Sequence, residues 1–173
     1  MNHKIAFLDR DGVINKSNVQ NGYIGKIKYF KLIPGAIRAI KYIKSLNYKV
    51  VIVSNQSGVA RGYFKITDVY KIHKYLNNKL KKNDTKLDKI LFCPFHIEGK
   101  IKKYKKKSKL RKPDNGMFKI INKIWKVDKR KSFMIGDQKS DMKFAKKSGI
   151  KGFLFKEKNL YEFVKSKKFI KFF

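Results

Sequence analysis

Two pairs of carboxylates stand out among the 12 acidic residues of this 173-residue chain. Asp9 and Asp11 follow one short apolar run, and Asp137 and Asp141 follow another. Carboxylates this close repel each other unless a counter-charge lies near them. Mg²⁺, which takes one or two carboxylates together with waters and phosphate oxygens, would supply that charge. For Asp9 and Asp11 a solvated acidic turn is the alternative, but a chain with only 12 acidic residues places two of them here, which counts against that alternative.

Two further groups suit the binding of phosphate. The string Ser54 to Gly58 (SNQSG) offers the hydroxyl, amide and backbone N–H groups that cradle phosphate oxygens. Arg111 and Lys112 stand beside Pro113 and supply two cations. Each signal is weak by itself, because Ser, Asn and Gly after a strand are common in turns, and basic pairs are frequent in this sequence. Their order along the chain, together with the carboxylates, carries the argument.

The elements that must position these groups alternate between short apolar runs and helical patterns. Strands are predicted at 5–8, 50–53, 90–92, 132–135 and 152–155, and helical periods run through 37–43, 66–80, 117–124, 142–145 and 160–164. This alternation predicts an α/β fold, a central parallel sheet in a three-layer, Rossmann-like arrangement. Ligands bind beyond the carboxyl ends of such strands, and Asp9, Ser54, Cys93 and Asp137 each lie near a strand's end. Met117, Ile121, Ile124 and Trp125 are expected in the core.

The net charge of +33, from 45 Lys and Arg, favours anionic partners such as phosphorylated metabolites, nucleic acids or acidic membranes. The lysines are spread along the whole chain, whereas a nucleic-acid-binding surface concentrates its charge. Lys, Ile, Asn, Phe and Tyr are abundant as well, which indicates a bias of the whole composition. Nucleic acid is therefore the weaker alternative among the partners.

The length fits one domain, spanning residues 1–173. The single cysteine, Cys93, excludes an internal disulfide and fits a reducing compartment. No stretch approaches the roughly 18 apolar residues of a membrane span, and the first strand begins too early for a signal peptide. We expect a monomeric, cytoplasmic protein with no membrane partner.

The four motifs resemble those of the haloacid dehalogenase (HAD) superfamily of phosphotransferases. They are Asp9-x-Asp11-Gly12, Ser54-Asn55, Lys112 and Gly136-Asp137-x-x-x-Asp141. The longer strings FLDRDGVIN (7–15), SNQSGVARG (54–62) and RKP (111–113) resemble the branch that holds D,D-heptose 1,7-bisphosphate phosphatase and histidinol-phosphate phosphatase. The resemblance runs from about residue 5 to residue 155. It implies a HAD fold, and the spacing of the motifs leaves no room for a large cap domain.

The resemblance also implies a mechanism. Asp9 would attack phosphorus and form an aspartyl-phosphate, and Asp11 would protonate the leaving oxygen and then activate water. Mg²⁺ would be bound by the carboxylate of Asp9, the backbone carbonyl of Asp11 and Asp137. Asp141 would orient Lys112 or a metal-bound water.

The phosphoryl group would be held by Ser54 and Lys112. Arg111, with its planar guanidinium, suits a second phosphate on the substrate. The full set of expected substrate contacts is Gln20, Asn21, Gly22, Tyr23, Asn55, Gln56, Arg61, Arg111 and Gln138.

The chain departs from the family at the loop before Arg111. Many members hold a structural zinc there through a C-x-H and a C-x-C pair, and tetrahedral zinc wants four such ligands. Here Phe95 stands where the first histidine belongs, with His96 one place off, and residues 108–110 (SKL) replace the second cysteine pair. We expect no zinc and predict that Cys93 is a small buried apolar residue.

The loop from Cys93 to Arg111 remains long, which in the family goes with the heptose enzyme. The function predicted from the sequence is therefore Mg²⁺-dependent removal of the C7 phosphate from D-glycero-D-manno-heptose 1,7-bisphosphate, a small phosphorylated sugar. The alternatives are histidinol-phosphate phosphatase, which would share the site, and a nucleic-acid end phosphatase or basic nucleic-acid-binding protein, which the charge would suit.

Overall fold

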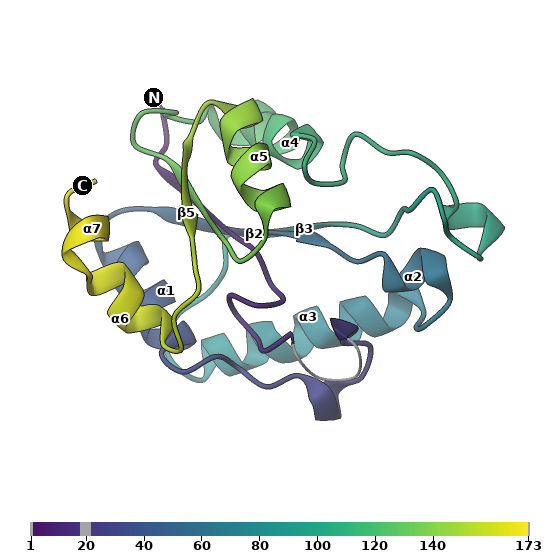
Figure 1. The fold of residues 1–173 in the computed structure, drawn as a ribbon. Coiled ribbons are helices and arrows are strands. Elements are labelled where there is room, and N and C mark those ends of the chain that lie inside the picture. Colours follow the sequence, from purple (N-terminus) through teal and green to yellow (C-terminus); the bar gives the residue numbers. More distant parts are fainter. Residues whose placement is uncertain (1, 18–21, 173) are drawn as a thin grey trace.

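In the computed structural model, which describes residues 2–17 and 22–172, five strands form one parallel sheet (Figure 1). The strands are β1 (Ile5–Leu8), β2 (Lys49–Asn55), β3 (Lys89–Cys93), β4 (Phe133–Gly136) and β5 (Lys151–Leu154). Their spatial order is β3-β2-β1-β4-β5, so the chain builds outward from β1 on one side and then on the other. Such a reversal leaves a crevice beyond the carboxyl end of the central strand, where ligands bind in open α/β sheets.

Helices cover both faces of this sheet, which confirms the predicted three-layer α/β fold. They are α1 (Ala36–Ser45), α2 (Gly58–Arg61), α3 (Ile66–Lys81), α4 (Gly116–Trp125), α5 (Lys139–Ser148), α6 (Leu160–Lys165) and α7 (Lys167–Ile170), with 3-10 turns η2 (Ile27–Tyr29) and η3 (Lys102–Tyr104). Helices α4 and α5 lie on one face, and α1, α3, α6 and α7 on the other (Figure 1). The sequence patterns did not indicate α2, α7, η2 or η3, because three or four residues are too few to show a helical period.

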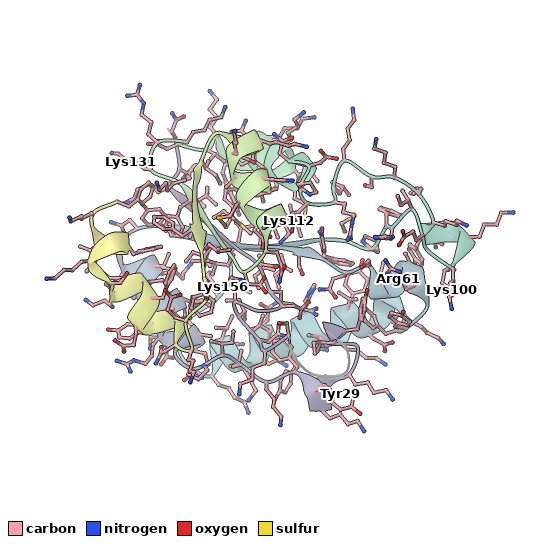
Figure 2. The ribbon with its side chains drawn as sticks, viewed as in Figure 1. Tyr29, Arg61, Lys100, Lys112, Lys131 and Lys156 are labelled. Atoms are coloured by element: carbon pink, nitrogen blue, oxygen red, sulfur yellow. The ribbon has the colours of Figure 1, made fainter. Side chains whose placement is uncertain are left out.

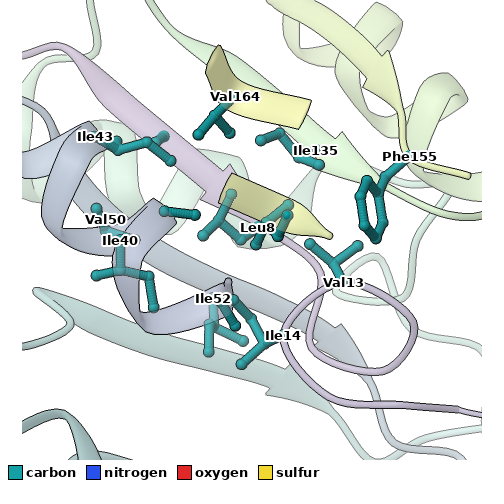
Figure 3. Close-up of a cluster of buried hydrophobic side chains, with 14 of the residues drawn as sticks. Leu8, Val13, Ile14, Ile40, Ile43, Val50, Ile52, Ile135, Phe155 and Val164 are labelled. Atoms are coloured by element: carbon teal, nitrogen blue, oxygen red, sulfur yellow. The ribbon is translucent and has the colours of Figure 1, made fainter. Parts of the chain in front are cut away.

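The central strands are buried on both faces. Leu8 and Ile52 point into the larger core cluster beside α1 (Figure 3), whereas Phe7 and Val51 point into the cluster beneath α4 and α5. All four side chains are fully buried. Because successive side chains of a strand alternate between faces, a strand covered on both sides reads as one continuous apolar run. That is why the strands could be read from the sequence.

Side chains at the start of two helices fix where those helices begin. The backbone N–H of Gln138 donates to Asp141 Oδ2 over 3.0 Å at the start of α5. At α6, Asn159 Oδ1 accepts from the N–H groups of Tyr161 and Glu162. These bonds satisfy N–H groups that the helix itself leaves unpaired. The first of them also fixes Asp141 close to the carboxyl end of β4.

No cap domain is inserted between the strands in the described part of the chain. Besides the helices α1, α3 and α4 that cover the sheet, the three longest connections carry only η2, α2 and η3. None of the described helices is long and apolar enough to cross a membrane. Lysine side chains project from the molecule in all directions, with Lys100 and Lys131 toward opposite ends in this view (Figure 2). The positive charge therefore surrounds the molecule and is not gathered on one face.

The core expected along α4 is only partly present. Met117 and Ile121 are buried, but Ile124 is 46% exposed and Trp125 is partly exposed, under the Lys49 ammonium. The helical period gives the direction of a side chain but not how far the neighbouring layer extends. The prediction for Ile124 was wrong because the last turn of α4 is not covered.

This difference within one helix yields a matched test. We expect Ile121→Ala to lower the free energy of unfolding by about 2–5 kcal/mol, because it leaves a cavity in a filled core. Ile124→Ala makes the same chemical change at the exposed position and is expected to cost less than about 1 kcal/mol. Urea denaturation followed by circular dichroism measures both, and equal losses would contradict the placement of α4.

Candidate active site

A cleft of about 410 Å³ lies beyond the carboxyl ends of β1, β2 and β4. Its wall contains most of the polar residues that the sequence singled out. The lining residues are Asp9, Asp11, Ser17, Gly22, Tyr23, Ile24, Asn55, Gln56, Ser57, Gly58, Phe64, Arg111, Lys112, Asp137, Gln138 and Ser140. The volume lies in the range of sites for small molecules. The expected gathering of motifs at one edge of the sheet is therefore present.

Lys112, labelled near the middle of the view in Figure 2, lies between two carboxylates. Its Nζ is 3.0 Å from Asp9 Oδ1 and 2.6 Å from Asp141 Oδ1, and all three residues are buried. Burial alone favours the neutral amine, but the charges of Asp9 and Asp141 outweigh it and raise the pKa of Lys112. The residue is thus a fixed positive charge beside Asp9.

The backbone of Lys112 is tied to the end of β2. Asn55 Nδ2 donates to the Lys112 carbonyl, and Asn55 Oδ1 accepts from the Lys112 N–H, each over 3.0 Å. Asn55 was expected to contact substrate. It does reach the cleft wall, but both groups of its side-chain amide bind the chain segment that carries the lysine. Its evident role is to anchor Lys112.

The surroundings of Asp9 disfavour the ionised form of its carboxyl group. Burial is the main cause that raises its pKa, to about 7; Lys112 opposes that shift, whereas the charges of Asp141 and Asp11 add to it. The backbone N–H of Arg10 donates to Asp9 Oδ1 over 2.7 Å. Near neutral pH the carboxyl group is therefore only partly ionised, and a neighbouring cation would favour the charged, nucleophilic form.

The carboxylates fit a divalent cation. Asp9, Asp137 and Asp141 each offer an oxygen atom within 4.8 Å of the others. Asp137 Oδ1 is buried and has no hydrogen-bond partner among residues 2–17 and 22–172, and burial raises the pKa of this side chain. Asp141 is already engaged with Lys112 and with the N–H of Gln138. Asp9 and Asp137 are thus the carboxylates best placed for a hard cation such as Mg²⁺.

Gly12 allows the backbone after β1 to approach Asp137. Its φ of +88° lies in the left-handed region, and a Cβ at this position would overlap the carboxylate of Asp137. Glycine is therefore required at position 12 for two reasons: the left-handed backbone conformation and the lack of space for a Cβ beside Asp137. The close approach brings the first and fourth strands' carboxylates to one point.

Asp11 has a counter-charge of its own. Arg10, which is fully buried, donates to it from Nε and from Nη2, with Nη2 at 2.9 Å from both carboxylate oxygens. Asn15 Nδ2 and Gln56 Nε2 donate to the same carboxylate over 2.9 and 2.7 Å. From the sequence, a metal alone is expected to relieve the repulsion between the carboxylates. At Asp11 that relief comes from Arg10, whose position could not be read from the sequence.

Ser54 lies beneath the cleft wall. It is almost fully buried, and its Oγ accepts from Gln56 Nε2 over 2.8 Å. A hydroxyl that accepts a hydrogen bond can still donate its own proton, so Ser54 keeps a donor for a phosphate oxygen. Gln56, expected to contact substrate, is itself 3% exposed and joins Ser54 to Asp11.

The remaining predicted contacts fall into three sets. Gly22, Tyr23, Arg111 and Gln138 line the cleft, and Nη1 of Arg111 is buried without a hydrogen-bond partner in the described structure. Arg61 is not part of the cleft wall. Its Nη2 is 3.1 Å from Glu98 Oε2, so in this structure it binds the following loop. That Arg61 contacts the substrate stays a prediction. Gln20 and Asn21 lie outside the described residues.

Several residues of the site carried no signal that identified them. Phe64 and Ile24 are apolar parts of the wall, and Ser17 and Ser140 are ordinary polar residues in sequence. His73 was placed only on a helical face; in the structure its Nε2 lies 3.5 Å from Nη1 of Arg10. These contacts depend on how distant elements pack, which local pattern does not encode.

Cys93 is fully buried at the end of β3, as predicted. Its Sγ contacts the carbonyl of Phe95, and His96 Nδ1 accepts from the N–H of Glu98. Among the residues that the structure describes, neither belongs to the group of side chains close enough to share a metal. The loop is fastened to α2 by a backbone bond of 2.9 Å from Ile101 N–H to the carbonyl of Ala60. That the protein binds no zinc stays a prediction.

Comparisons with known proteins agree with this geometry. The family model described as polynucleotide kinase 3 phosphatase matches residues 4–159. A D-glycero-beta-D-manno-heptose-1,7-bisphosphate 7-phosphatase of Rhodopseudomonas palustris is 41% identical over 160 residues, which cover 92% of this chain and 87% of the relative. A putative HAD-like phosphatase of Mesorhizobium loti has a TM-score of 0.81 at 30% identity, covering 88% of this chain and 72% of that one.

A second solved structure is the D,D-heptose 1,7-bisphosphate phosphatase of B. bronchiseptica complexed with magnesium and phosphate. Its TM-score is 0.79 at 26% identity, over 95% of this chain and 87% of that one. Fold, motifs and relatives together define the class: this chain is a phosphatase of the HAD superfamily. Within that class it belongs to the family that contains the heptose-1,7-bisphosphate 7-phosphatases.

The close approach at Gly12 predicts the effect of one added methyl group. We expect Gly12→Ala to weaken the binding of Mg²⁺ at least about tenfold, because the methyl group would displace the carboxylate of Asp137. Gly149→Ala is the matched control: Gly149 also has a positive φ, +69°, but a Cβ there meets only ordinary contacts. Titration calorimetry with MgCl₂ measures both, and wild-type affinity in Gly12→Ala would contradict the proposed metal position.

The raised pKa of Asp9 predicts a pH dependence of stability. The folded pKa, about 7, lies above the ordinary value of 3.8, so the folded state holds a proton that the unfolded state has released. Asp9 therefore makes the free energy of unfolding fall as pH rises from about 4 to about 7, by at most about 1.4 kcal/mol per pH unit.

The buried His73 acts in the opposite direction. Burial and the charge of Arg10 lower its pKa from 6.5 to about 3, so its contribution to stability is lost as pH falls. The effect of Asp9 is isolated by comparing wild type with Asp9→Asn in urea at pH 5 and pH 8, with EDTA present. We expect the free energy of unfolding of Asp9→Asn, relative to that of wild type, to be higher at pH 8 than at pH 5. The same difference between variant and wild type at both pH values would contradict the raised pKa of Asp9.

Proposed function

We propose that this protein removes the C7 phosphate from D-glycero-D-manno-heptose 1,7-bisphosphate through an aspartyl-phosphate on Asp9. The observation that carries the proposal is the buried Lys112, held between Asp9 and Asp141 at a cleft that also contains Asp11 and Asp137. The names of the relatives support the substrate.

The residues divide the chemistry as follows. Asp9 attacks phosphorus, and Lys112 stabilises the negative charge on the phosphoryl oxygens as the bond to the sugar oxygen breaks. Asp11 gives its proton to that leaving oxygen, and afterwards takes a proton from the water that hydrolyses the aspartyl-phosphate. Ser54 donates its hydroxyl proton to a phosphoryl oxygen.

The metal's contribution, when it is held by the Asp9 carboxylate, the backbone carbonyl of Asp11 and Asp137, is to neutralise further charge on the phosphoryl group. Three observations support these ligands: the grouping of the carboxylates, the unpaired buried oxygen of Asp137 and the oxygen-only donor set. Asp141, whose oxygens bind Lys112 and the N–H of Gln138, serves as a positioning residue.

The second phosphate would be bound at the rim of the cleft. Arg111 lines the wall, and its buried Nη1 has no hydrogen-bond partner in the described parts of the chain. A guanidinium with free donors suits a phosphate, which it can bind through two parallel hydrogen bonds. Tyr23 and Gln138 lie in the same cleft and would contact the sugar. We further propose that the enzyme acts as a cytoplasmic monomer, formed by one domain.

A second candidate is an end phosphatase for nucleic acids. The description of the matching family model and the net charge of +33 favour it. The chemistry at Asp9 would be unchanged, since only the group that carries the phosphate differs. The even spread of the lysines around the molecule favours the small substrate (Figure 2). Histidinol phosphate would fit the same machinery and is the third substrate to test.

A substrate panel tests the proposal. Purified protein is assayed for phosphate release from heptose 1,7-bisphosphate, histidinol phosphate and 3′-phosphorylated oligonucleotides, with MgCl₂ and with EDTA. We expect the highest kcat/KM for the heptose, and loss of activity with EDTA. Asp9→Asn is expected to lower the rate by at least about 10³-fold, because the nucleophile is gone. Turnover by Asp9→Asn would refute the mechanism. A higher kcat/KM for the oligonucleotides than for the heptose would refute the proposed substrate and favour the nucleic-acid end phosphatase.

A further inference from the structure

A buried chain of side chains connects α3 to the residue that handles the proton. His73 of α3 lies against Arg10, Arg10 binds Asp11, and Asp11 lines the cleft. Neither Arg10 nor His73 touches the cleft, and neither has a part in the chemistry described above. Both are nonetheless buried polar groups, which are costly to bury unless they are hydrogen-bonded.

The arrangement fixes the plane of the Asp11 carboxylate. Arg10 reaches both of its oxygens, while Asn15 holds Oδ1 and Gln56 holds Oδ2. Donors from three residues thus reach the carboxylate from different directions and fix its orientation. The side chain of Asp11 is nonetheless 20% exposed toward the cleft, so it is both accessible and prevented from rotating.

Arg10 is itself fixed from two sides. Its carbonyl accepts from the N–H groups of Ile14 and Asn15, over 2.8 and 3.0 Å, which fixes the turn after β1. Its Nη1 lies 3.5 Å from His73 Nε2. Arginine can only donate, so His73 accepts through Nε2 and carries its own proton on Nδ1. The ring of His73 packs edge-on against Phe92, with 5.4 Å between the ring centroids.

We propose that Arg10 is a positioning residue that orients the carboxylate of Asp11 for proton transfer, and that His73 holds Arg10 in place. The proposal rests on the proposed function. In the step concerned, an Asp9 oxygen forms a bond to phosphorus and the bond from phosphorus to the sugar oxygen breaks. The proton of Asp11 passes to that sugar oxygen, which leaves an aspartyl-phosphate, a sugar hydroxyl and an ionised Asp11.

The leaving group distinguishes positioning from a structural role. A sugar alkoxide is strongly basic and needs the proton as it departs, whereas the p-nitrophenolate of p-nitrophenyl phosphate departs without one. The parameter kcat/KM reports the steps up to the first irreversible one, so it excludes hydrolysis of the aspartyl-phosphate. A misplaced Asp11 should therefore lower kcat/KM for the sugar phosphate and spare the nitrophenyl ester.

The test uses Arg10→Lys, which keeps the charge but cannot bind both carboxylate oxygens in one plane. We expect kcat/KM for heptose 1,7-bisphosphate to fall about tenfold or more, and kcat/KM for p-nitrophenyl phosphate to fall less than about threefold. His73→Leu, which removes the acceptor, should give the same pattern to a smaller extent. His73→Gln, which restores an acceptor, should recover the wild-type ratio.

Wild type is assayed in parallel, so that two failures can be told apart. Release of phosphate from neither ester by wild type would overturn the proposed function and this inference with it. An active wild type whose variants lose both activities equally, or lose neither, would overturn the inference alone. If Arg10→Lys does not fold, as judged by circular dichroism, the two His73 variants decide the question by the same ratio.

Discussion

The structure depends on a buried cation placed between two carboxylates. Lys112 contacts Asp9 and Asp141 at the base of the cleft, where all three residues are buried and screening by water and salt is weak. Removing Lys112 would leave two buried carboxylates without their counter-charge, and loss of the partner of a buried charge costs several kcal/mol (about 3–5) in typical proteins. Three separate segments of the chain must therefore meet at this point: the end of β1, the segment before α4 and the first turn of α5. The fold brings these three segments together, and Asp9 and Lys112 line the cleft beside them.

The sheet makes this meeting possible because all of its strands run the same way. Loops that leave the carboxyl ends of β1, β2 and β4 emerge on one edge, beside the point where strand order reverses. Gly12 then lets the first of these loops come into contact with Asp137, and Asn55 ties the segment of Lys112 to β2. These motifs are thus held by contacts with one another, without a cap domain among the residues that the structure describes.

Much of this could be predicted from the sequence, for a physical reason. Asp9 and Asp137 follow strands buried on both faces, and such strands leave a continuous apolar run that is easy to see. What could not be predicted was which polar side chains bind each other. Arg10 and His73 are 63 positions apart, and Asn55 and Lys112 are 57 apart. The ion pair between Arg61 and Glu98, 37 positions apart, could not be predicted from the sequence either.

The lysines that project on all sides of the molecule have a consequence for selectivity (Figure 2). A field of one sign draws every anion toward the protein and speeds encounter, but it acts on charge alone and extends only about 10 Å at moderate salt. Nucleotides, sugar phosphates and free phosphate would all gather at the surface. The electrostatic field cannot distinguish among these anions. Selectivity must then come from uncharged residues of the cleft wall, such as Tyr23 and Phe64, which contact the substrate according to its shape.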